Sequence, residues 1–341
     1  DFPPPPLLDA IAASALRTMA ESRPQNISNL AWSFSGLPGG DAPFLAAIAA
    51  AALRPLQQCK VQEIANIAWA CSSREYPDAP LLQSISASSI PTRAEEFEVQ
   101  NISNFAWSFA KLQVRDAPWL DSIASAAIPP ISSQCRAQEL VNIAWAYATL
   151  QVVHQPLLKA IAASSRAPSD LSQFAPQNFA NLAWSFSRIE FADWPCLAAL
   201  SAASIPRCGD GHFKPNELAT MAWAFSPLAY ADCPLFEALS SAAIKMIAQA
   251  GPSAMEMLVW SFCRLGTPSL AWPFLGGVDA GTASISPLLL ECEQRGALDG
   301  EARLMRSLAQ GAGMGPAASR ALAMRSLEHG WLIGGEPRGA P

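Results

Sequence analysis

Apolar side chains recur at helical spacing around a tryptophan that returns every 37 to 39 residues. The repeat tryptophans are Trp32, Trp69, Trp107, Trp145, Trp184, Trp223 and Trp260. Counted from each tryptophan, apolar residues occupy positions −5, −2, +2 and +5, as Ile27, Leu30, Phe34 and Leu37 do. This spacing is typical of one face of an α-helix and differs from the alternation of a half-buried strand. We therefore expect one helix around each tryptophan.

A second apolar string follows at position +11 in the first six repeats and begins with proline, as in PLLQSISASSI. Its apolar residues, such as Leu120 and Ile123, again have helical spacing. An acid at position +9, for example Asp78, precedes most of these prolines by two residues. Negative charge is favoured at a helix N-terminus, so we expect this acid to cap the second helix. Pro24, Pro176 and Pro215 at position −8 suit the first residue of the first helix.

Two helices per ~38 residues predict an all-α fold, a right-handed α-solenoid of about seven stacked repeats. We assign residues 1–275 to this solenoid, which opens in mid-repeat with a second string that lacks its partner. The glycines at 276, 277 and 281 mark a change of composition. Residues 276–341 are therefore expected to form a partly flexible helical tail that caps the array.

One sector of the first helix is more polar than the rest and holds positions −7, −3, 0 and +4, because α-helical residues advance by about 100°. Position −3 is asparagine in five repeats: Asn29, Asn66, Asn104, Asn142 and Asn181. Glutamine stands at −7, including Gln100 and Gln138, and +4 varies, with Lys111, Thr149, Arg188 and Arg264 among its residues. Two interpretations remain open: the asparagines and tryptophans contact a ligand along a concave face, or they pack and hydrogen-bond between repeats.

Composition and charge exclude several classes of protein. The chain is 51% apolar and 15% charged, with a net charge of −6 and a pI of about 5.2, so it is not a strongly basic nucleic-acid-binding protein. A local basic strip stays compatible with these values. Eight cysteines without a CxxC pair predict reduced, buried thiols and no metal site. Because the histidines are isolated and catalytic motifs are lacking, we expect no enzymatic activity and no cofactor. His154 is expected to be a surface replacement for the acid at +9.

The ~38-residue unit with its asparagine and Ala-Trp core resembles the octotricopeptide and heptatricopeptide repeats of algal and protist organelles, which are related in style to the repeats that precede RAP domains. The resemblance covers residues 1 to about 275, although the PPPEW-like string of the algal consensus is missing. It implies an imported protein of the chloroplast or mitochondrion that binds RNA along its concave side, through the five asparagines at −3 and their neighbours. The tail does not resemble a RAP domain, so no nuclease-like activity is carried over.

A second class of function stays open beside RNA binding. Asparagine and tryptophan on an inner helix are also similar to armadillo repeats, which grip an extended polypeptide. The acidic pI suits such a protein scaffold in a large organellar assembly. Basic side chains at position +4, such as Lys111 and Arg188, favour single-stranded or ribosomal RNA, free or within a ribonucleoprotein. Neither alternative requires a small-molecule substrate or a transmembrane segment.

Overall fold

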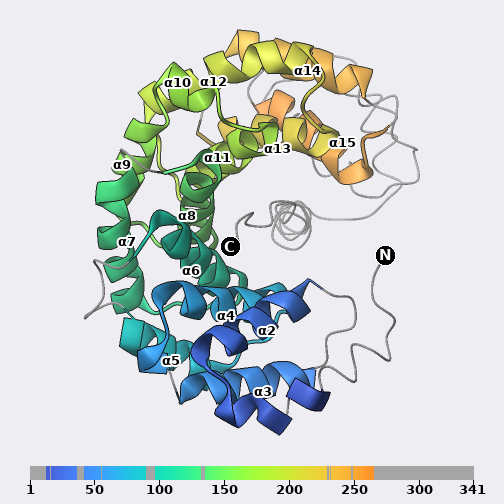
Figure 1. The fold of residues 1–341 in the computed structure, drawn as a ribbon. Coiled ribbons are helices and arrows are strands. Elements are labelled where there is room, and N and C mark those ends of the chain that lie inside the picture. Colours follow the sequence, from blue (N-terminus) through green and yellow to red (C-terminus); the bar gives the residue numbers. More distant parts are fainter. Residues whose placement is uncertain are drawn as a thin grey trace, which may run out of the picture. The chain divides into compact units, whose positions relative to one another are not determined.

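The computed structural model describes residues 13–15, 17–36, 42–54, 56–89, 97–131, 135–228, 230, 232–246 and 249–264 (Figure 1). Every regular element in these ranges is a helix, which confirms the all-α class. The chain divides into two compact units between Ile161 and Ala162, inside helix α9. The predicted tail, residues 276–341, lies outside the described residues.

The first helix of each repeat carries the repeat tryptophan. These helices are α2 (Pro24–Ser35), α4 (Val61–Ser73), α6 (Val99–Lys111), α8 (Ala137–Thr149), α11 (Pro176–Arg188), α13 (Pro215–Phe225) and α15 (Pro252–Arg264). The three prolines at position −8 each stand at the first helical residue, as predicted. Other starts use the side chain at −6: a Glu63 carboxylate oxygen accepts the backbone N–H of Lys60 at 2.8 Å. A helix start leaves N–H groups unpaired, and this bond satisfies one of them.

Four first helices, α4, α6, α8 and α11, are followed by a left-handed residue at position +6. In α4 the N–H of Tyr76 donates to the carbonyl oxygen of Cys71 at 2.9 Å, while Glu75 between them has φ 52°. In α6 the N–H of Val114 donates to Phe109 at 2.8 Å across Gln113, whose φ is 57°. This 6→1 bond is the Schellman ending, which turns the chain sharply towards the second helix.

The second helix starts where the sequence predicts. These helices are α3 (Ala42–Leu53), α5 (Ala79–Ser89), α7 (Ala117–Ile131), α9 (Gln155–Ser164), α12 (Trp194–Gly209) and α14 (Cys233–Lys245), with the short elements η1 (Met19–Glu21), η2 (Leu56–Gln58) and α10 (Pro168–Leu171) beside them. Carboxylates at position +9 accept hydrogen bonds from backbone N–H groups of the first turn: Asp78 accepts from Leu81 at 2.9 Å, and Asp193 accepts from Cys196 at 3.0 Å. The predicted acidic caps are therefore confirmed at Asp78, Asp116, Asp193 and Asp232, while Asp41 lies outside the described residues.

Within each compact unit the helices form two layers (Figure 1). In the first unit α2 packs on α4, α4 on α6 and α6 on α8, while α3 packs on α5 and α6 on α7. In the second unit α11 packs on α13 and α13 on α15, while α12 packs on α14. Buried aliphatic residues such as Leu120 and Leu158 lie between the layers, and the Tyr147 hydroxyl donates to the carbonyl oxygen of Leu120. We call the two sets the first-helix layer and the second-helix layer.

Candidate ligand-binding face

Tryptophans of neighbouring first helices stack on one another. In the first compact unit the ring centroids of Trp32 and Trp69 lie 4.2 Å apart, and those of Trp69 and Trp107 lie 6.4 Å apart. In the second unit Trp223 and Trp260 stack at 6.3 Å. The interplanar angles are 30°, 28° and 25°, an offset arrangement that aromatic pairs favour. The tryptophans therefore pack repeat against repeat, and little ring surface is left for a ligand in the interior repeats.

The asparagines at position −3 differ in burial along the array. Asn66, Asn104 and Asn181 are buried, with 3% of Asn104 exposed, whereas Asn142 is half-buried and Asn29 is exposed. Asn29 lies on α2, which is the earliest described helix in the chain that carries a repeat tryptophan. Interior asparagines thus offer a ligand only a small part of their surface, although their part in binding stays a prediction.

Positions −7 and +4 leave more of each side chain accessible. Gln100 and Gln138 at −7 are half-buried. At +4, Lys111, Thr149, Arg188 and Arg264 are all half-buried too. The predicted site residues therefore differ in burial. The interior tryptophans and three of the asparagines are buried, the glutamines and the +4 residues are half-buried, and Asn29 is exposed.

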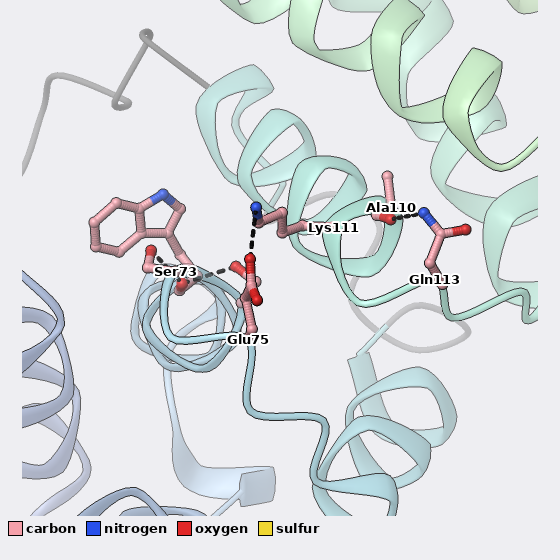
Figure 2. Close-up of polar contacts among 7 residues, drawn as sticks. Ser73, Glu75, Ala110, Lys111 and Gln113 are labelled. Carbon is pink, nitrogen blue, oxygen red and sulfur yellow. Dashed lines mark hydrogen bonds and ion pairs between the residues drawn. The ribbon is translucent and has the colours of Figure 1, made fainter. Parts of the chain in front are cut away.

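Two of the basic residues at +4 have partners within the protein. The Lys111 ammonium lies 3.1 Å from a carboxylate oxygen of Glu75, which belongs to the preceding repeat (Figure 2). The Arg264 guanidinium stands over the ring of Trp260, 5.1 Å from its centroid. Thr149 differs from both, because its hydroxyl oxygen is buried without a hydrogen-bond partner among the described residues.

Two further positions carry similar surface residues in four repeats each, and neither was predicted from the sequence. In the four repeats where the structure describes it, position +6 is Glu75, Gln113, Gln151 or Glu190, each exposed and with positive φ. Position −9, the residue before the first helix, is basic and exposed in four repeats: Arg23, Lys60, Arg136 and Lys214. The signal was present in both cases as a residue type repeated at a fixed distance from the tryptophan.

The buried cysteine thiols are suited to packing. Burial raises the pKa of the Cys71 and Cys196 thiols to about 12, with a smaller contribution from the nearby Asp78 and Asp193 carboxylates. These two thiols and that of Cys208 are free and buried, as predicted, and Cys59 is buried too, while Cys135 is half-buried and Cys233 is exposed. Within the described ranges there is no group of three or more histidine, cysteine, aspartate or glutamate residues that could hold a metal ion.

The face can offer a ligand amide and hydroxyl hydrogen bonds, positive charge and a limited area of aromatic ring. In the same described part of the chain, no helix is long and apolar enough to cross a membrane. No protein-family model matches the sequence, and no curated protein matches it at a significant level.

Proposed function

We propose that this chain is a non-enzymatic RNA-binding protein built as a right-handed α-solenoid of about seven two-helix repeats over residues 1–275. It holds single-stranded RNA, free or in a ribonucleoprotein, along the concave side of the first-helix layer. Residues 276–341 cap the array. The proposed cellular location, the chloroplast or the mitochondrion, is based on the resemblance to organellar repeat proteins.

The proposal rests on the different surroundings of the acidic and the basic side chains at the helix starts. The acids at +9 are half-buried and directed at backbone N–H groups: Asp78, Asp116, Asp193 and Asp232. The acids at −6 are also half-buried, and they accept the N–H of the residue before the helix: Glu63, Glu139 and Glu217. The basic residues at −9, in contrast, are exposed beside those same helix starts, and Arg136 keeps most of its surface although its Nε lies 3.9 Å from a Glu139 carboxylate oxygen. The net charge of −6 therefore understates the positive charge available at this edge.

The uniformity of the buried positions favours a grip that tolerates many sequences. Tryptophan at 0 and asparagine at −3 barely change from repeat to repeat, and in interior repeats they pack between helices. They hold the first helices in register, so that the exposed bases at −9 and the half-buried residues at −7 and +4 form parallel rows. Rows of basic and amide groups suit a single strand, whose phosphates and base edges repeat at regular intervals.

Filter binding of labelled twelve-nucleotide homopolymers to the full chain, at several salt concentrations, tests this function. Replacing Lys60 and Arg136 together by glutamine should weaken binding to every homopolymer. It should also reduce the slope of log affinity against log salt by about 1.4, for two lost phosphate contacts on a single strand. The matched control replaces Arg54 and Lys159, which are exposed on the second-helix side, and should leave the slope unchanged. No binding by the unaltered chain, or equal effects of the two double variants, would refute the proposal.

A protein scaffold is the second candidate, favoured by the internal partners of Lys111 and Arg264. Because these two charges are already engaged, the +4 row is less positive than its sequence indicates. Amide and hydroxyl groups at −7 and +4 would then bind the backbone of an extended polypeptide. Failure to retain any homopolymer at low salt, together with a folded protein, would favour this alternative.

A further inference from the structure

The row of stacked tryptophans in the first compact unit has an open end at α2. Trp69 lies between Trp32 and Trp107, with ring centroids at 4.2 Å and 6.4 Å. Trp32 has Trp69 as its one aromatic neighbour among the described residues, because α2 packs on α4 and no described first helix precedes it. Trp32 is accordingly half-buried, whereas Trp69 is 5% exposed and Trp107 is 9% exposed. The ring face turned away from Trp69 is therefore the part that a planar ligand can reach.

Polar side chains that are not engaged by the protein lie on the same face of α2. Gln25, Asn29 and Trp32 stand at positions −7, −3 and 0, and residues spaced by four and three share one side of a helix. Gln25 and Asn29 are exposed, and neither side chain has a hydrogen-bond partner among the described residues. Arg23 at −9 is exposed as well, and its side chain does not cap the helix.

This combination of accessible groups matches the parts of a nucleotide. A nucleobase stacks on an indole ring, an amide offers a donor and an acceptor to the base edge, and a guanidinium group binds phosphate. The described interior repeats keep the equivalent tryptophan and asparagine largely covered, as at Trp107 and Asn104. Among the described first helices, α2 alone has an exposed residue at −3.

We propose that the open end of α2 binds the terminal base of a single-stranded RNA, with the base stacked on Trp32, its edge bonded by Asn29 and its phosphate near Arg23. The inference rests on the proposed RNA binding and adds a site that fixes one end of the strand. A base in this position continues the row of tryptophan rings, and the rest of the strand follows the first-helix layer. Every base has a flat face, so the site accepts any terminal base.

The fluorescence of 2-aminopurine, a base analogue that loses emission when it stacks on an aromatic ring, tests this site in the full chain. Two twelve-nucleotide oligo-U strands carry the analogue as the 5′ or as the 3′ terminal base. The unaltered chain should quench one of the two strands and leave the other bright. Trp32→Leu should restore the lost emission and weaken binding of that strand about tenfold. Asn29→Ala, at an exposed position, should fold normally and weaken binding about threefold.

Trp194→Leu and Gln83→Ala are the matched controls. Trp194 is 51% exposed at the start of α12 and stacks on Tyr230, so it is an accessible indole on a second helix. Gln83 is exposed on α5 and supplies an amide in the second-helix layer. Both control variants should bind and quench the strands as the unaltered chain does.

The possible failures of the site and of the proposed function differ. Quenching of neither strand, quenching that persists in Trp32→Leu, or equal effects of Asn29→Ala and Gln83→Ala would overturn the site, while RNA binding itself would stand. If circular dichroism shows that Trp32→Leu does not fold, the comparison of Asn29→Ala with Gln83→Ala decides. If the unaltered chain binds neither strand, both the site and the proposed function are wrong.

Discussion

His154 Nδ1 accepts a hydrogen bond from the backbone N–H of Leu157 at 3.2 Å, as the Asp78 carboxylate does from Leu81 at 2.9 Å. The histidine thus replaces the acid at +9 in its capping role, and its Nε2 lies 3.3 Å from a carboxylate oxygen of Asp121. Removing such an acceptor should destabilise the helix start. We expect His154→Ala to lower the free energy of unfolding by about 0.5 to 2 kcal/mol in urea denaturation.

His154→Asn is the matched control for the cap. Asparagine keeps a short acceptor at the helix start and ranks among the best residues there, so most of the stability should be retained. Equal losses in the alanine and asparagine variants would show that the contact with Asp121, and not the cap, is responsible.

Helix starts and repeat length could be predicted from the sequence because they depend on local chemistry. Proline suits the first helical residue whatever surrounds it, and Asp78 caps α5 through an atom three residues away. Burial at −3 could not be predicted in this way. Asn104 and Asn29 have nearly the same local sequence, with Phe105 in place of Leu30, yet only Asn104 lies between two described first helices. The depth of a residue depends on its neighbours in space.

The difference between Asn104 and Asn29 leads to a prediction about stability. Asn104→Ala removes a buried amide and should lower the free energy of unfolding by about 1 to 3 kcal/mol. Asn29→Ala, at the same position but exposed, should change it by less than about 0.5 kcal/mol. Thermal and chemical denaturation of the two variants checks this. A harmless Asn104→Ala substitution that nonetheless abolished RNA binding would restore position −3 as the ligand-contact row.

Thiol labelling should separate the cysteines by burial. The pKa of the Cys196 thiol is raised to about 12, chiefly because burial disfavours the thiolate. Only about one molecule in 10,000 then carries the reactive thiolate at pH 8. Iodoacetamide should therefore label the exposed Cys233 quickly and reach Cys71 and Cys196 only after unfolding. Peptide mapping by mass spectrometry measures each rate, and comparable rates for Cys196 and Cys233 would contradict this assignment.

The same thiols predict a loss of stability in alkali. Folding raises the pKa of Cys71 and of Cys196 to about 12, from an ordinary value of 9.0. Below pH 9 both states are protonated and the thiols have no effect on pH dependence. Between pH 9 and 12 only the unfolded chain ionises, so the free energy of unfolding should fall, by up to about 1.4 kcal/mol per pH unit for each thiol. Cys196→Ala should make this alkaline fall shallower, and an unchanged slope would mean that the thiol titrates normally.

The residues at +6 and −9 could be found only by asking which residue type recurs at a fixed distance from the tryptophan. Glutamine at a left-handed helix end contradicts local preference, so no propensity rule predicts Gln113 or Gln151 there. Lys60 and Lys214 precede helices without capping them through their side chains, so rules for helix starts also pass over them. Surface rows of this kind become visible only when the repeats are aligned in space.

Gln151→Gly should make the protein more stable. Gln151 has φ 54°, a conformation that strains every residue with a Cβ atom, and its N–H donates to the carbonyl oxygen of Ala148 at 3.1 Å. Glycine keeps this backbone bond and relieves the strain, although it also gains freedom in the unfolded chain. We expect a net gain of about 0.5 to 1 kcal/mol in the free energy of unfolding, measured by urea denaturation. Gln151→Ala, which keeps the Cβ atom, should give no gain. If glycine gave no gain either, the glutamine side chain would itself stabilise the helix end, as the Gln113 amide does through its bond to the Ala110 carbonyl oxygen.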